Sequence, residues 1–166
     1  MLERRWIFSV LKDVNPTNLE KAEELFLQGY NCAQAVVFVS ARETSLAPEL
    51  AVKLATGFGA GMGRQQEVCG AVTGGILALG LRSGRALGEE KAKNEETYGQ
   101  VRSLMERFSA QHGSCLCREL LDGCDLRTEA GQREFKERGY LRSRCCEYVK
   151  SVVTLLDETA GPRPIT

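Results

Sequence analysis

Apolar and polar positions repeat along this chain with a helical period, and no segment alternates as a half-buried strand does. Thr17 and Glu20 form a capping-box pattern that predicts a helix continuing to about Gly29. A second helix is expected after Asn31, with Cys32 in its first turn. A third is expected from Pro48 to near residue 57.

The segment from Glu67 to Leu81 predicts a helix with two distinct faces. One face is an apolar stripe, formed by Val68, Val72, Ile76 and Leu79. The other carries almost no side-chain bulk and consists of Gly70, Ala71, Gly74, Gly75 and Ala78. Each glycine inside a helix costs about 1 kcal/mol relative to alanine. We therefore expect this helix to be central, with a helix of the same chain, a cofactor or a second subunit packed closely against it.

Further helices are expected over residues 88–111, 116–121, 128–138 and from about Arg144 to Glu158. The inner face of the longest is predicted to consist of Tyr98, Val101, Leu104, Met105 and Phe108. Residues 3–12 predict a short amphipathic helix and residues 160–166 a frayed tail. The sequence thus predicts an all-α fold: one domain over residues 1–166, a bundle of roughly six to eight helices around the Gly/Ala-rich helix.

Composition excludes several classes of partner. The 22 basic and 22 acidic residues balance, so there is no excess positive charge to bind nucleic acid. No apolar run reaches the length of about 20 residues that a membrane span needs. The apolar stretch at the N-terminus ends at Leu11 without a signal-peptide cleavage site, and we expect a cytoplasmic protein.

A glycine at every second position marks the loop from Gly57 to Arg64. No register of these glycines gives the G-x-G-x-x-G fingerprint, and no Gly-Lys-Ser/Thr follows, so no nucleotide cofactor is predicted. The loop is expected to form a tight turn between packed helices or to present backbone amides to an anionic group.

Seven cysteines are the main chemical feature of the sequence. Cys32, Cys69 and Cys145 each stand at the start of a predicted helix, where the helix dipole stabilises a thiolate and lowers its pKa. This position suits a metal ligand or a nucleophile, although a free cysteine can also pack as a small apolar residue.

Motifs that are missing narrow the chemistry further. The absence of Cys-x-x-Cys disfavours a thioredoxin-type dithiol and a zinc ribbon. The absence of Cys-x-x-Cys-His excludes covalent haem c. His112, the only histidine, is expected at a helix end, where its imidazole would bind terminal carbonyls.

Four cysteine segments together resemble the C_GCAxxG_C_C family of redox-active proteins, related to the cysteine-bearing part of split-Soret cytochromes. They are Asn31-Cys-Ala-Gln-Ala35, Cys69-Gly-Ala-Val-Thr-Gly74, Cys117-Arg-Glu-Leu-Leu121 and Cys145-Cys-Glu-Tyr-Val149. The resemblance covers residues 19–158 and implies a site built from Cys32, Cys69, Cys117 and Cys145, with Cys146 as a substitute for Cys145. Cys115, Cys124 and Cys146 are additional to the family pattern.

Three functions are compatible with these four cysteines. The first is an iron–sulfur cluster for electron transfer to a redox partner protein, since thiolates select such clusters. The second is a thiol–disulfide oxidoreductase or peroxide reductase with Cys69 as its nucleophile. The third is a structural zinc site. A homodimer is a further expectation, because a second copy could cover the small face of the central helix.

Overall fold

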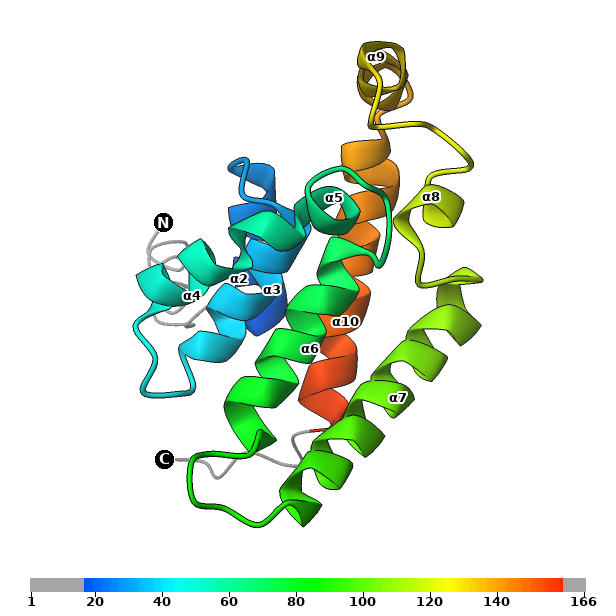
Figure 1. Ribbon diagram of the computed structural model, residues 1–166. Coiled ribbons are helices and arrows are strands. Elements are labelled where there is room, and N and C mark those ends of the chain that lie inside the picture. Colours follow the sequence, from blue (N-terminus) through cyan, green and yellow to red (C-terminus); the bar gives the residue numbers. More distant parts are fainter. Residues whose placement is uncertain (1–16, 160–166) are drawn as a thin grey trace, which may run out of the picture.

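The computed structural model describes residues 17–159, so the amphipathic helix expected at 3–12 and the tail at 160–166 lie outside the described residues. Within the described range the fold is all-α, as predicted (Figure 1). The helices are α2 (Asn18–Leu27), α3 (Cys32–Ala41), α4 (Pro48–Ala55), α5 (Gly59–Met62), α6 (Gly70–Ser83), α7 (Ala92–His112), α8 (Cys117–Leu120), α9 (Glu129–Glu137) and α10 (Cys146–Thr159). A 3₁₀ turn, η1 (Thr56–Phe58), precedes α5, and a π-helical turn, η2 (Leu141–Cys145), precedes α10.

Reciprocal capping boxes fix the starts of the first two helices. At α2 the Thr17 N–H donates to Glu20 Oε2 at 2.8 Å, and the Glu20 N–H donates to Thr17 Oγ1 at 3.2 Å. At α3 the Asn31 N–H donates to Gln34 Oε1 and the Gln34 N–H to Asn31 Oδ1, both at 3.0 Å. These bonds satisfy backbone donors that a helix start leaves without partners. They confirm both predicted starts and set Cys32 as the first residue of α3.

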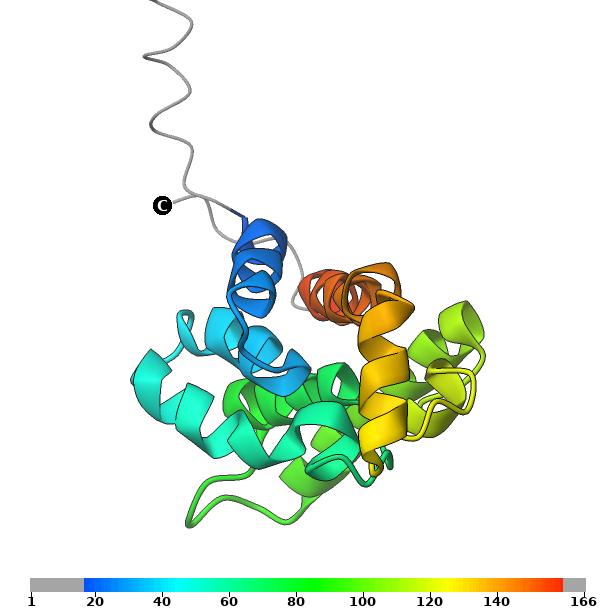
Figure 2. The ribbon, with the colours of Figure 1, turned by 90° about the horizontal axis from the view of Figure 1, so that it is seen from above.

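The Gly/Ala-rich helix α6 is central, with α3, α7 and α10 around it (Figures 1 and 2). A Cβ atom added at Gly74 would lie 2.9 Å from the Ala33 carbonyl oxygen of α3. One added at Gly75 would lie 2.8 Å from side-chain atoms of Leu104 in α7 and Val152 in α10. Of the three possibilities that the sequence left open, a helix of the same chain, a cofactor or a second subunit, helices of the same chain pack against the small face. No second subunit is needed to cover it.

The glycine-alternating loop forms a turn of left-handed backbone. Ala60 has φ 51° and ψ 39°, Gly61 has φ 66° and ψ 56°, and φ is also positive at Met62, Gly63 and Arg64. The segment labelled α5 is therefore not a right-handed helical turn. A left-handed conformation costs about 1–2 kcal/mol at each residue with a Cβ. Gly61 and Gly63 remove that cost at two positions of the turn. Gly59 has a different role, because a Cβ atom there would lie 2.5 Å from Asn31 Cγ.

Four details differ from the predicted helices. The longest helix begins at Ala92 rather than Gly88. The central helix begins at Gly70 rather than Glu67, because Val68 pairs with Leu116 in an isolated antiparallel bridge. Tyr98 does not belong to the inner face of α7, since 54% of it is exposed. The last helix does not begin at Arg144, because the π-helical turn joins it without a break to residues further upstream.

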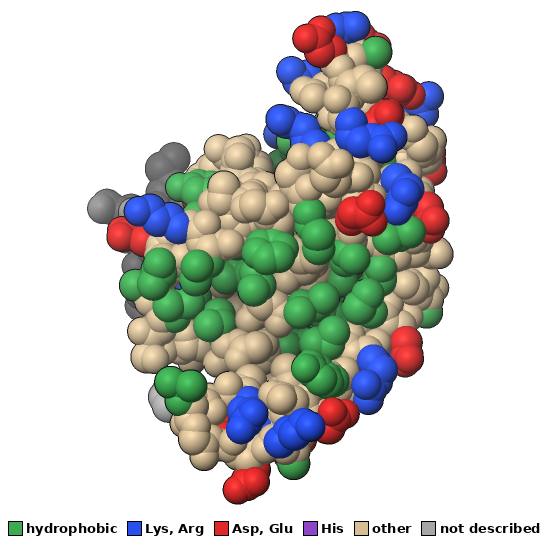
Figure 3. All heavy atoms as spheres, in the orientation of Figure 1, with side chains coloured by type: hydrophobic (Ala, Val, Ile, Leu, Met, Phe, Trp, Pro, Cys, Tyr) green, Lys and Arg blue, Asp and Glu red, His purple; other side chains and the backbone are tan. Residues whose placement is uncertain are grey.

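Apolar side chains also reach the surface. Figure 3 shows them spread over the face formed by α4, α6 and α7. Large exposed apolar residues on these helices include Leu50 and Leu54 of α4 and Leu81 of α6. Within residues 17–159, none of the helices combines the length and the apolar character required to span a membrane.

Candidate redox site

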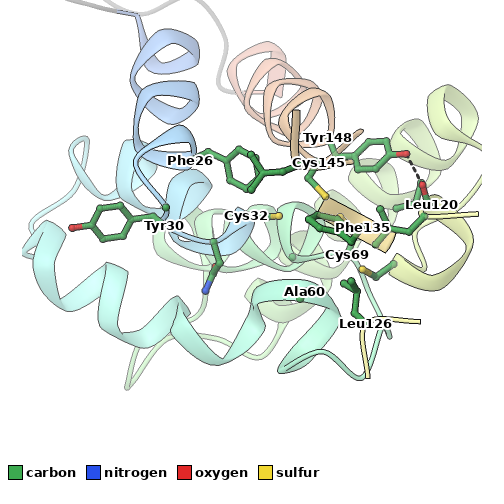
Figure 4. A pocket seen from close by; sticks show the side chains of 16 residues that line it. Phe26, Tyr30, Cys32, Ala60, Cys69, Leu120, Leu126, Phe135, Cys145 and Tyr148 are labelled. Atoms are coloured by element: carbon green, nitrogen blue, oxygen red, sulfur yellow. Dashed lines mark hydrogen bonds between the residues drawn. The ribbon is translucent and has the colours of Figure 1, made fainter. Parts of the chain in front are cut away.

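Cys32, Cys69, Cys117 and Cys145 line one cavity of about 200 Å³ (Figure 4). They come from the start of α3, the residue before α6, the start of α8 and the end of the π-helical turn. Apart from these cysteines, the wall consists of Phe26, Gly29, Tyr30, Asn31, Ala60, Gly70, Leu120, Leu121, Leu126, Phe135, Leu141 and Tyr148. None of the described residues on this wall carries a charge. The cavity therefore offers four sulfur atoms in largely apolar surroundings.

A short stretch of strand-like pairing positions two of the four cysteines. The Cys69 N–H donates to the Cys115 carbonyl at 2.8 Å, and the Cys117 N–H donates to the Glu67 carbonyl at 2.7 Å. These bonds flank the bridge between Val68 and Leu116. Residues 67–69 and 115–117 are thus held side by side, and Cys69 and Cys117 reach the same cavity.

A thiol–thiol contact brings the other two cysteines together. The thiol of Cys32 is hydrogen-bonded to that of Cys145, and Figure 4 shows both sulfur atoms at the same cavity. The expectation that Cys145 stands at a helix N-terminus is wrong, because the helical segment begins at Tyr140 with the π-helical turn, and Cys145 is the last residue of that turn. Such turns occur frequently at functional sites, where the wider turn redirects a side chain.

Two side chains that the sequence analysis did not select brace the wall of the cavity. Gln66 is only 3% exposed; its Nε2 donates to the Cys124 carbonyl at 2.7 Å, and its Oε1 accepts from the Leu126 N–H at 2.9 Å. The Tyr148 hydroxyl donates to the Leu120 carbonyl at 2.9 Å (Figure 4). A glutamine in a polar loop resembles an exposed residue, so no pattern in the sequence indicates this role.

Burial is the main cause of the raised pKa values of Cys69 and Cys117. It raises the pKa of Cys69 to about 12, with a further contribution from Cys32, although the amides of Ala71 and Val72 donate to its sulfur. Burial and the neighbouring Cys69 and Cys32 also raise the pKa of Cys117 to about 12. The pKa of Cys32 lies well above its ordinary value, through the hydrogen bond to Cys145 and then through burial. The expectation of a lowered pKa at Cys69 is therefore wrong, because desolvation outweighs the amide donors.

The three remaining cysteines lie outside the cavity wall. The Cys115 sulfur lies 3.2 Å from Ser109 Oγ, and the Cys124 thiol donates to the Gly131 carbonyl at 3.2 Å. Cys146, next to Cys145, points elsewhere and donates to Glu23 Oε1 at 3.5 Å. Cys117 and Cys145 thus face the cavity, whereas Cys115 and Cys146, close to them in the sequence, have other surroundings.

His112 does not have the hydrogen bonds that we expected at the end of α7. Its ring packs against Phe108 and Tyr148, with centroid distances of 4.6 and 5.0 Å. Its Nε2 is buried and has no hydrogen-bond partner in the described structure. Burial lowers the pKa of His112, which favours the neutral imidazole.

A single metal ion does not fit the described arrangement. Among residues 17–159, no group of three or more His, Cys, Asp or Glu side chains is close enough to bind one ion. A tetrahedral zinc site would need four sulfur atoms at about 2.3 Å from one point. The four cysteines line a common cavity without converging on one such point.

Comparisons with known proteins identify one related family. The family model described as "Putative redox-active protein (C_GCAxxG_C_C)" matches residues 30–159. No curated protein and no solved structure gives a significant match. The matched range includes Cys32, Cys69, Cys117 and Cys145.

Proposed function

Because the chain belongs to the C_GCAxxG_C_C family of redox-active proteins, we propose that its four cavity cysteines bind an iron–sulfur cluster that transfers electrons. The observation that carries this proposal is the convergence of Cys32, Cys69, Cys117 and Cys145 on one apolar cavity. Four cysteine thiolates are the usual ligand set of [2Fe–2S] and [4Fe–4S] clusters.

The donor set favours a cluster over a single ion. Sulfur ligands select iron–sulfur centres, zinc or copper(I) over hard cations, and the cavity wall has no carboxylate or imidazole among the described residues. In a cluster each thiolate binds its own iron or shares one with a second thiolate, so four sulfurs need not meet at one point. This arrangement agrees with cysteines that share a cavity without surrounding one ion.

The raised pKa values of the thiols are consistent with this role. Protonated thiols can be buried in the cavity at neutral pH, and metal binding would replace their protons. The amides of Ala71 and Val72, which donate to the Cys69 sulfur, would then stabilise its thiolate. A bound cluster would supply one-electron redox chemistry. Phe26, Leu121 and the other apolar wall residues would limit its contact with water.

A second candidate function rests on the contact between Cys32 and Cys145. These two thiols could form a disulfide, transferring two electrons and two protons to a substrate disulfide that is thereby reduced to two thiols. Cys69 is a poor choice as the nucleophile, because a thiol with a pKa of about 12 is almost entirely protonated at neutral pH.

We also propose a cytoplasmic location and a redox partner protein. All seven cysteines are free, as is usual in a reducing compartment. The partner would exchange electrons with the cavity. Formation of a homodimer stays a prediction, and the small face of α6 no longer supports it.

The test is anaerobic purification followed by measurement of the visible spectrum, iron and acid-labile sulfide. We expect a brown protein with stoichiometric iron and sulfide. Cys69→Ser and Cys117→Ser should lose the chromophore, whereas the matched controls Cys115→Ser and Cys124→Ser should keep it. A colourless protein in which oxidation joins Cys32 to Cys145 would select the second function. Stoichiometric zinc without sulfide would contradict both.

A further inference from the structure

A second cavity, of about 530 Å³, lies beside the cysteine cavity and has a different chemical character. The two share four wall residues: Ala60, Leu126, Phe135 and Leu141. The second cavity also has Arg64, Lys136 and Arg142 on its wall, and no acidic residue of the described chain lines it. Its volume falls within the range of about 300–1,000 Å³ typical of small-molecule sites.

Among residues 17–159, the three cations of this cavity have no ionic partner, unlike the arginines around them. Arg118, Arg127, Arg133, Arg138 and Arg144 all form ion pairs. Within the described chain, Arg64, Lys136 and Arg142 form none. Figure 3 shows Lys and Arg side chains at the base of the α9 projection, with Asp and Glu side chains near them. Three unpaired positive charges on one concave surface create a positive potential that attracts an anion.

Two segments of the chain supply the wall residues of this cavity. The left-handed turn supplies Ala60 and Arg64, and the segment from α9 to the π-helical turn supplies Phe135, Lys136 and Arg142. A non-glycine residue in left-handed conformation is strained, and such strain persists where surrounding contacts fix it, commonly at ligand-binding sites. Here the turn gives the cavity both an apolar wall residue and a cation.

We propose that this second cavity binds a small organic anion with an apolar body. Arg64, Lys136 and Arg142 would bind its carboxylate or phosphate group, and Phe135, Leu126 and Leu141 would contact the apolar part. A ligand bound there would contact Phe135, Leu126 and Leu141, which also line the cysteine cavity. The proposal concerns binding and goes beyond the proposed redox function, so its test needs no redox activity.

The test uses the fluorescent anion anilinonaphthalene sulfonate and its uncharged analogue N-phenyl naphthylamine, titrated into the full chain. We expect Lys136→Gln and Arg142→Gln each to weaken binding of the anion about three- to tenfold, since these cations are exposed at the cavity mouth. Binding of the uncharged analogue should not change. Arg133→Gln on the same helix is the matched control, because Arg133 is paired with Glu129 outside the cavity, and it should bind the anion as the wild type does.

Competition identifies the anionic group. Displacement of the probe by phenyl phosphate but not by benzoate would indicate a phosphate ligand, and the reverse would indicate a carboxylate. The proposal is overturned if neither competitor displaces the probe, or if the Lys136→Gln/Arg142→Gln double variant binds it with wild-type affinity. Near-ultraviolet circular dichroism of each variant verifies native packing, because partly unfolded proteins also bind this probe.

Discussion

The thiol of Cys32, the first residue of α3, is hydrogen-bonded to the thiol of Cys145 at the end of the π-helical turn. The adjacent Cys146 instead faces Glu23 of α2. Two neighbouring cysteines therefore have different surroundings, and each can be replaced separately.

Replacing Cys145 should abolish the redox chemistry, and replacing Cys146 should not. We expect Cys145→Ser to lose the cluster or, in the dithiol case, the disulfide with Cys32. Cys146→Ser should retain wild-type iron and sulfide content or the wild-type number of oxidisable thiols. Iron analysis and thiol titration under anaerobic conditions measure both. Loss in Cys146→Ser with retention in Cys145→Ser would show that the assignment is reversed.

Stability of the metal-free protein should fall in alkaline solution. An ordinary thiol has a pKa of about 8.5, whereas that of Cys69 is about 12 in the folded protein. Between these values the unfolded chain loses a proton that the folded chain keeps. The contribution is fully present below the lower value and disappears as the pH rises through the higher one. Urea unfolding between about pH 8 and about pH 11 measures this decline.

The variant Cys69→Ala isolates the thiol from other groups that titrate in the same range. Its stability should decline less steeply with pH than that of the wild type, since one raised pKa has been removed. If the free energy of unfolding changes equally with pH in the two proteins, the Cys69 thiol does not contribute to the pH dependence of stability.

Gly74→Ala should destabilise the protein by about 1–3 kcal/mol, because the added methyl group overpacks the contact between α6 and α3. Its Cβ would lie 3.0 Å from Ala33 Cα and from Val36 Cβ. Gly80→Ala is the matched control in the same helix, since no atom of the described part of the chain lies within 4 Å of its added Cβ. The control should stabilise the protein by about 0.5–1 kcal/mol. Thermal and urea unfolding compare the two, and equal effects would exclude a close packing contact at Gly74.

Gln66→Ala should cost about 1–3 kcal/mol for each buried group that loses its partner. The two groups are the Cys124 carbonyl and the Leu126 N–H. Faster amide exchange should appear around Leu126 in the same variant. Gln65→Ala, at an exposed neighbouring position, should change neither stability nor exchange. Unchanged exchange at Leu126 in Gln66→Ala would rule out the bracing role.

The sequence predicted those parts of the fold that local interactions determine. The capping residues Thr17 and Asn31 act within one turn of their helices. The glycines of α6 are unfavourable in a helix, so their number indicates that another element packs closely against it. The sequence did not predict the environment of Cys69, because its acidity depends on burial by segments distant along the chain. Gln66 was missed for the same reason: its partners lie in the loop after α8.

The π-helical turn has a consequence for helical phase. A π turn contains about one residue more than an α turn, and each α-helical residue advances the side-chain direction by about 100°. Tyr140, just before the turn, packs with Cys117, Leu121, Cys124 and Leu126, whereas Val149 and Val152 after it belong to the main core. Deleting one residue between Leu141 and Arg144 would put these two packing units out of phase. The π-helical turn thus connects the wall of the cysteine cavity to the part of α10 that faces the core.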